Sequence, residues 1–181
     1  MRPVSSIAAL AFIATALLGC TDSSVAKTGE QSADAETPLA ALMLPTTTGS
    51  LRSVVDSNAA VTILQIVDAG CGLCVKNAAD VLRVRERLSA TPTALHVIVS
   101  SATAEEARMW AESAQLPDFV VVFADEGRKL RSATDVVGIP TLLMLNRDGR
   151  EGARVMGNLD VPALQEERIE AAIVSVRDRK P

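Results

Sequence analysis

The stretch that decides the fold is Val61–Cys74, which reads VTILQIVDAGCGLC. Its first half, Val61–Val67, is apolar and rich in β-branched residues, which predicts a strand buried on both faces, as in a parallel sheet. A short turn then leads to two cysteines, Cys71 and Cys74. Beyond them apolar residues recur at helical spacing, so we expect a helix over Cys74–Leu88.

The C-x-x-C spacing at the start of a helix indicates reversible dithiol chemistry. The intervening residues, Gly72 and Leu73, leave the two sulfurs close enough to form a small ring. The helix start directs free N–H groups and a partial positive charge at Cys71, which favours its thiolate. Cys74 lies one turn further in and is more shielded. We therefore expect Cys71 to attack a partner disulfide and Cys74 to resolve the mixed disulfide.

The amino terminus predicts export. After a basic start, Ile7–Leu18 is an apolar run that is too short to span a bilayer. It ends in Leu17–Cys20 (LLGC), which resembles the bacterial lipobox. The resemblance implies cleavage of residues 1–19 as a signal peptide and lipid attachment at Cys20. An ordinary secretory peptide and a buried helix are the alternatives. Thr21 follows, not Asp, so the sequence does not say which membrane holds the protein.

Export also explains the cysteine count. The chain has three cysteines, and a lipid on Cys20 leaves one pair, Cys71 and Cys74, in an oxidising environment. On the chain-entropy model, a disulfide over so short a loop contributes little stability. The spacing therefore favours a redox role over a structural one.

The rest of the chain divides into a tether and one domain. Residues 20–37 are mostly small and polar, which predicts a flexible tether. Residues 38–181 then form a single domain, because a chain with 48% hydrophobic residues can bury a core. The net charge of −4 and the aromatic content of 2% disfavour nucleic acid as a partner.

Strands and helices are expected to alternate, which predicts an α/β domain with a mixed sheet. Pro45–Ser57 should form a hairpin followed by a short turn of helix. Thr103 and Glu106 have the spacing of a capping box. The other expected elements are strands at Ala94–Val99, Thr141–Leu145 and Ala153–Gly157, a short strand or extended segment at Phe119–Ala124, and helices at Thr103–Ala114, Glu126–Val136 and Pro162–Val176. The inner side of the last helix should carry Leu164, Ile169, Ala172, Ile173 and Val176.

From residue 38 to residue 178 the chain resembles the thioredoxin-like, membrane-anchored thiol–disulfide oxidoreductases of the TlpA/ResA (redoxin) type. The strand–C-x-x-C–helix unit carries the resemblance, together with Val137–Thr141 (VGIPT), which is similar to the family's cis-proline loop. Between these motifs lies a strand–helix insertion, with Asp125–Arg128 (DEGR) and Asn146–Gly149 (NRDG) placed as in the family.

The resemblance implies a thioredoxin fold, in which a central mixed β-sheet is flanked by helices, with an N-terminal hairpin and a strand–helix insertion. It also implies that Pro140 is cis and that Ile139, Pro140 and Thr141 line a substrate groove beside the cysteines. Without the cysteine pair, a trans proline at the start of a strand would be the simpler interpretation.

The sequence departs from the family at three places. Gly70 stands where the family usually has Trp, and Leu73 where it often has Pro. Gln65 replaces a buried acid that relays protons in thioredoxins. A neutral amide cannot act as a general base, so water or another acid, such as Asp68 or Glu126, would have to serve.

The residues around the cysteines favour a reductant. Gly72 and Leu73 offer no charge, and Ile139 is the residue that reducing thioredoxins have before the proline. We expect a lipoprotein at the periplasmic face of a bacterial membrane that reduces protein disulfides with electrons from a membrane donor. A non-catalytic tethered binding module that uses the same groove, and a disulfide oxidant or isomerase, are the alternatives.

No cofactor or metal is expected. A c-type haem needs His directly after the second cysteine, where Val75 stands. Zinc needs about four ligands, and the single histidine, His96, lies in an apolar strand and is expected in the core, as is Trp110.

Overall fold

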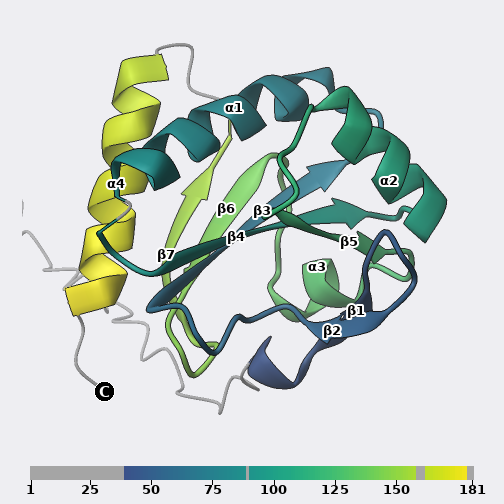
Figure 1. The fold of residues 1–181 in the computed structure, drawn as a ribbon, viewed down its shortest axis with the longest axis horizontal. Coiled ribbons are helices and arrows are strands. Elements are labelled where there is room, and N and C mark those ends of the chain that lie inside the picture. The colour runs from purple at the N-terminus through teal and green to yellow at the C-terminus, as the bar shows by residue number, and fades with distance from the viewer. Residues whose placement is uncertain (1–38, 89, 158–161, 179–181) are drawn as a thin grey trace, which may run out of the picture. The chain divides into compact units, whose positions relative to one another are not determined.

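The computed structural model describes residues 39–88, 90–157 and 162–178, all within the second of two units in the chain, residues 35–181. Within these ranges a five-stranded sheet forms the centre (Figure 1). Its strands are, in spatial order, β5 (Val121–Asp125), β4 (Thr93–Ser100), β3 (Val61–Asp68), β6 (Thr141–Leu145) and β7 (Glu151–Met156).

The sheet is mixed, as predicted. Strands β3, β4 and β5 are parallel, whereas β6 is antiparallel to β3 and β7 is antiparallel to β6. The register pairs Asp68 with Ser100 and Ser100 with Asp125, so the three parallel strands end at one edge of the sheet. The chain leaves β3 and β4 at this edge and enters a helix after each.

Helices cover both faces of the sheet (Figure 1). On one face lie α1 (Gly72–Arg87), α2 (Ala104–Ser113) and α4 (Pro162–Asp178). On the other lie the short helix α3 (Lys129–Ala133) and a hairpin of β1 (Met43–Pro45) and β2 (Leu51–Ser53), which the 3-10 turn η1 (Leu39–Ala41) precedes.

Strand β3 supplies side chains to two separate cores. Ile63 and Val67 pack with α1, α2 and α4, while Leu64 and Ile66 pack toward α3 and the hairpin. All four side chains have no exposed surface. Burying a side chain of this kind contributes roughly 1.5–3 kcal/mol. The prediction of a strand covered on both faces is confirmed, and the physical reason is that each face of the sheet has its own helical layer.

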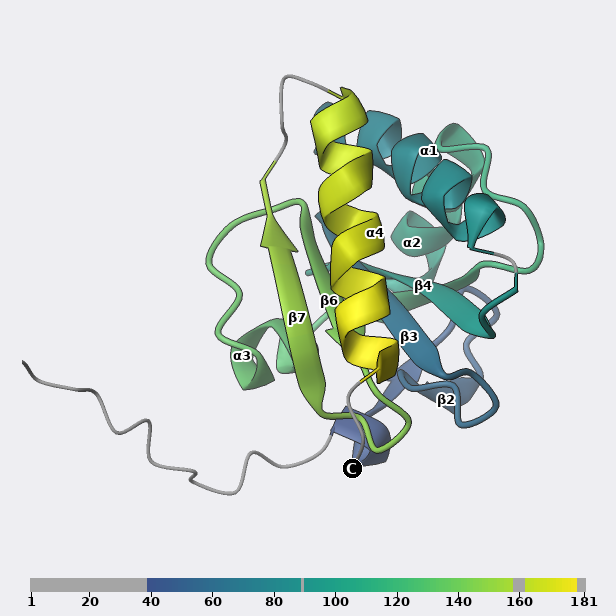
Figure 2. The ribbon, with the colours of Figure 1, turned by 90° about the vertical axis from the view of Figure 1, so that its left-hand side faces the viewer.

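Helix α4 closes the fold beside α1 and over β7 (Figure 2). Ile169, Ile173 and Val176 are buried as predicted, and Ala172 packs against the same core; the side chain of Leu164 lies outside the described residues. Glu166 of α4 forms ion pairs with Arg83 and Arg87 of α1. Both arginines also donate hydrogen bonds to the Glu166 carboxylate, and these bonds hold its pKa below the usual value.

Two predicted helical segments are wrong in extent. The helical turn expected at the end of Pro45–Ser57 is absent from the described chain, where Asp56 forms a local turn by accepting from the N–H of Asn58 at 2.9 Å. The helix expected over Glu126–Val136 shrinks to Lys129–Ala133, because Arg128 before it has a left-handed φ of 53°. The hairpin is confirmed, but it begins at Met43.

The predicted turn after β6, Asn146–Gly149, is confirmed, and its geometry requires glycine at position 149. Gly149 has φ 75°, and a Cβ there would lie 2.4 Å from the backbone nitrogen of Ala40. Its carbonyl accepts from the N–H of Leu39 at 3.1 Å. Strand β5 starts at Val121, later than predicted, and β7 starts at Glu151, earlier than predicted.

The signal peptide at 1–19, lipid attachment at Cys20 and the tether at 20–37 lie outside the described residues and stay predictions, as does the domain boundary at residue 38. In the part of the chain that the structure describes, no helix has the length and apolar character needed to cross a bilayer.

Candidate active site at the Cys71–Cys74 pair

The turn between β3 and α1 presents the two cysteines. The backbone carbonyl of Asp68 accepts from the N–H of Cys71 at 3.0 Å, and its side chain accepts from the N–H of Gly70 at 3.2 Å. These bonds close the turn within three residues. Cys71 is therefore the N-cap of α1 and lies at the carboxyl edge of the parallel strands.

Cys71 and Cys74 are joined by a disulfide, with a Cα–Cα distance of 5.3 Å. The Cys71 sulfur also accepts a hydrogen bond from the N–H of Cys74 at 3.2 Å. A sulfur thus occupies the place of the side-chain oxygen that usually caps a helix. The free N–H groups and the positive end of the helix dipole stabilise negative charge there.

The two sulfurs differ in access. Cys71 is half-buried, whereas Cys74 is fully buried in the core under α1. Gly72 and Leu73 between them are both exposed, and nothing lies within 4 Å of a Cβ built on Gly72. A partner thiol or disulfide can therefore reach Cys71, while Cys74 is reached only from within the molecule.

The register of the sheet brings the predicted cis-proline loop to the same edge. Thr141 pairs with Ile66, and continuing this register places Pro140 opposite Val67, near the end of β3 and four residues before Cys71. The Ile139–Pro140 peptide bond is cis, as the resemblance implies. The carbonyl of Gly138 accepts from the Thr141 hydroxyl at 2.6 Å, which fixes the loop.

Two apolar residues whose exposure the sequence did not predict also lie at this edge. Val137 is 83% exposed at the start of the proline loop, and Met156, opposite Thr141 in the register, is 51% exposed. Exposed apolar side chains stand out only once burial is known, because the same residues in a strand pattern predict core positions.

A pair of buried amides joins β3 to α1, the helix that carries the cysteines. Gln65 of β3 donates from Nε2 to Oδ1 of Asn77 in α1 at 2.9 Å. Gln65 and Asn77 are 0% and 1% exposed. Of the two acids predicted as substitutes for a buried base, Asp68 is half-buried in the β3–α1 turn and Glu126 is exposed after β5; their role stays a prediction.

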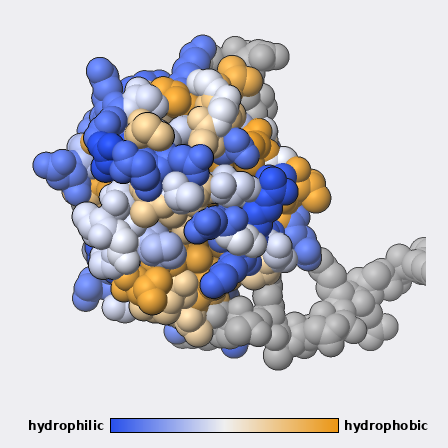
Figure 3. Space-filling model, turned by 90° about the vertical axis from the view of Figure 1, so that its right-hand side faces the viewer, coloured by the Kyte–Doolittle hydropathy of each residue, from blue (hydrophilic) through white to orange (hydrophobic). Residues whose placement is uncertain are grey.

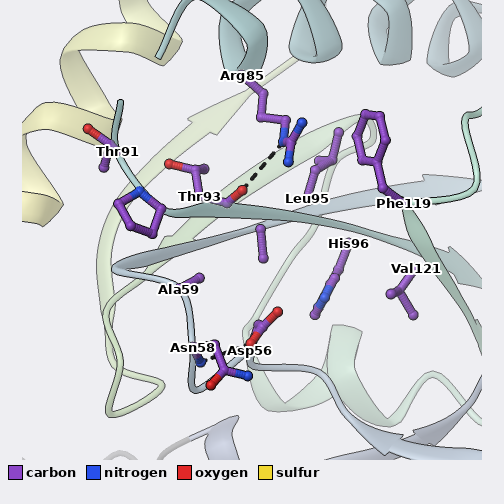
Figure 4. Close-up of a pocket in the computed structure, with 12 residues that line it drawn as sticks. Asp56, Asn58, Ala59, Arg85, Thr91, Thr93, Leu95, His96, Phe119 and Val121 are labelled. Atoms are coloured by element: carbon purple, nitrogen blue, oxygen red, sulfur yellow. Dashed lines mark hydrogen bonds between the residues drawn. The ribbon is translucent and has the colours of Figure 1, made fainter. Parts of the chain in front are cut away.

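A cavity of about 330 Å³ lies at the opposite, amino end of β4 (Figure 4). Arg85 stacks over the Phe119 ring at 4.2 Å and donates to the carbonyl of Thr93 at 3.4 Å. His96 lies in the wall, as a core residue bonded through Nδ1 to the carbonyl of Val54 at 2.8 Å, and burial lowers its pKa. Since β3 has eight residues, this end lies roughly 23 Å from the cysteines.

The cavity carries no group for thiol chemistry. Across the described residues, no cluster of His, Cys, Asp and Glu could hold a metal ion. The side of the molecule that carries α2 in Figure 1 is mainly hydrophilic, with small separate hydrophobic patches (Figure 3). The cysteine pair, and not the cavity, is therefore the candidate site for thiol–disulfide chemistry.

The sequence matches no protein-family model and no curated protein. Solved structures are similar in fold. A Chlorobium tepidum protein, assigned as a thiol:disulfide interchange protein DsbE, aligns with a TM-score of 0.63 and 20% identity over 75% of this chain and 92% of that one. A secreted disulfide oxidoreductase of Mycobacterium tuberculosis aligns with a TM-score of 0.59 and 13% identity over 78% of this chain and 98% of that one.

The exposed lipoprotein thioredoxin of Streptococcus pneumoniae aligns with a TM-score of 0.57 and 16% identity over 74% of this chain and 97% of that one. These similarities, with the mixed sheet and its two helical layers, show that the domain has the thioredoxin fold.

Proposed function

We propose that this protein is an exported, membrane-tethered thiol–disulfide oxidoreductase that reduces disulfides of other proteins through Cys71 and Cys74. The observation that carries the proposal is the asymmetric pair at the start of α1. One sulfur is accessible and accepts from a helix N–H at 3.2 Å, and the other is fully buried. This arrangement suits an attacking and a resolving thiol.

The proposed reaction moves one electron pair. In the dithiol form, the Cys71 thiolate attacks one sulfur of a partner disulfide, and the other partner sulfur leaves as a thiolate that takes up a proton. Cys74 then loses its proton and attacks the Cys71 sulfur of the mixed disulfide. The second partner sulfur leaves, so the partner becomes a dithiol and the Cys71–Cys74 disulfide forms.

The proline loop is proposed to bind the partner. Ile139 is half-buried beside Pro140, and Thr141 begins β6 next to β3. An extended segment of the partner lying along this loop would bring its sulfur to Cys71. Gly72 and Leu73 add no charge that would stabilise the thiolate further, which supports the reducing direction.

The tether is proposed from the lipobox-like residues before Cys20 and the polar segment 20–37. Similarity in fold to a secreted oxidoreductase and to an exposed lipoprotein supports an extracytoplasmic location. A reductant there needs its dithiol restored, and a membrane electron donor would supply the electron pair.

Replacing Cys74 by Ser tests the proposal. This variant should retain partners covalently through Cys71, because no second thiol is left to resolve the mixed disulfide. The adducts would be seen as reductant-sensitive bands on non-reducing gels. Cys71→Ser is the matched control and should form none, since its remaining thiol is buried.

The same experiment distinguishes the alternative of a non-catalytic binding module. Such a module would bind its partners equally well as wild type, Cys71→Ser and Cys74→Ser, and would form no covalent adduct with any of them. That result would overturn the proposed function.

A further inference from the structure

The buried amide pair is incompletely hydrogen-bonded in the disulfide state. Gln65 and Asn77 share one hydrogen bond, and the remaining oxygen of Gln65 and nitrogen of Asn77 have no partner among the described residues. Both side chains are at least 99% buried. A buried polar group without a partner is costly, so a native structure that keeps two of them requires a reason.

The number of unpaired groups does not depend on which end of each side-chain amide is assigned as oxygen and which as nitrogen. Two side-chain amides that share one hydrogen bond always leave one oxygen and one NH₂ group free, whichever of them donates. The pair therefore offers an acceptor and a donor to a third group.

The buried Cys74 sulfur is the candidate for this third group, because Asp80, which is equally close to Asn77 along α1, is already paired with Arg83. Asn77 follows Cys74 by three residues in α1, a spacing that puts the two Cβ atoms about 5–6 Å apart on one helix face. Gln65 lies on the same face of β3 as Ile63 and Val67, which share a core with Cys74. The residues that share this core with Cys74 are hydrophobic, and among them Trp110 has an indole N–H without a partner in the described residues.

We propose that Gln65 and Asn77 are positioning residues that bind the Cys74 thiol and thereby favour the dithiol over the disulfide. Reduction by a partner dithiol brings two electrons and two protons, breaks the S–S bond and leaves Cys74 as S–H. The thiol gains a donor that a disulfide lacks, and the free amide oxygen accepts it. The free NH₂ group donates to the sulfur.

The two unpaired amide groups therefore destabilise only the oxidised state, in which Cys74 has no S–H to donate. The Cys71–Cys74 disulfide is therefore more easily reduced than it would be with apolar residues at positions 65 and 77. This effect opposes that of the uncharged Gly72–Leu73 dipeptide, which favours a reducing couple. The inference rests on the proposed thiol–disulfide exchange and specifies what tunes it.

The test measures the Cys71–Cys74 couple at equilibrium with reduced and oxidised glutathione. In the double variant Gln65→Leu/Asn77→Leu the disulfide is no longer penalised, so the equilibrium should shift toward it about tenfold, which is ~30 mV more negative for two electrons. Thr93→Val is the matched control. It also removes a buried hydroxyl without a described partner, but at the start of β4, so it should leave the equilibrium unchanged.

A second measurement needs no substitution. The side-chain amide signals of Gln65 and Asn77 in ¹H–¹⁵N NMR spectra should move when the wild-type disulfide is reduced. That result would support the inference even if the double variant failed to fold.

The outcomes separate the two proposals. Suppose that the wild-type protein equilibrates with glutathione, but the equilibrium constant of the double variant lies within twofold of the wild-type value, or the amide signals do not move on reduction. Either result would overturn the role of the amide pair and leave the exchange reaction standing. A wild-type couple that never equilibrates would overturn both.

Discussion

Helices α1 and α2 begin at the same edge of the sheet, but different atoms cap them. At α2, the Thr103 hydroxyl accepts from the N–H of Glu106, and the Glu106 carboxylate accepts from the N–H of Thr103 at 2.8 Å. At α1, the sulfur of Cys71 takes the capping place. Oxygen caps satisfy the helix end permanently, whereas a sulfur cap changes its charge with the redox state.

The comparison teaches where chemistry can arise in this fold. Parallel strands direct the helices that follow them to begin at one edge, so each helix start there favours a negative group. At α2 that group is the carboxylate of Glu106, which is already bonded. At α1 the group is the half-buried sulfur of Cys71, so we expect reactivity there.

The strongest test of the difference is alkylation of the reduced protein. Because the start of α1 stabilises the thiolate, iodoacetamide should label Cys71 at neutral pH about ten times faster than a cysteine in an unstructured peptide. Mass spectrometry after a timed quench would measure the rate, with Cys74 labelled far more slowly because it is buried. A Cys71 rate no faster than that of the peptide would remove the basis of the assignment.

A smaller effect is expected from Thr103→Ala. Loss of the capping hydroxyl at α2 should lower the free energy of unfolding by about 1 kcal/mol, as measured by urea denaturation. Exchange through Cys71 should not change, because the α2 cap is a structural feature only. Thr103→Ser keeps the hydroxyl and serves as the control; a change in exchange rate with either variant would show that the two helix ends are coupled.

The smallest effect concerns acid pH. The N–H and hydroxyl of Thr103 hold the pKa of the Glu106 carboxyl below its usual value of 4.5. The stabilisation is therefore present above that value and is lost as the pH falls through the lowered pKa. Glu106→Gln should flatten this part of the pH dependence of stability, and salt should weaken the effect, because the carboxylate is exposed. An unchanged pH profile in the variant would contradict this account of the cap.

The motifs near the chemistry could be predicted from the sequence because they are local. The strand, the turn and the C-x-x-C helix are contiguous, and the capping box of α2 spans four residues, so their signals did not depend on the rest of the chain. The helical turn after the hairpin and the length of α3 were wrong, because the Asp56 side chain and the left-handed Arg128 override local propensity.

What the sequence alone determined is the order of strands and helices, their apolar faces and the presence of two cysteines in redox spacing. Only the tertiary structure decided that the side chain of Gln65 in β3 bonds to Asn77 in α1, and which residue of β3 lies opposite the start of β6. The physical reason is that strand register and helix packing join residues distant in the chain. No periodicity in the sequence encodes which buried amides find partners.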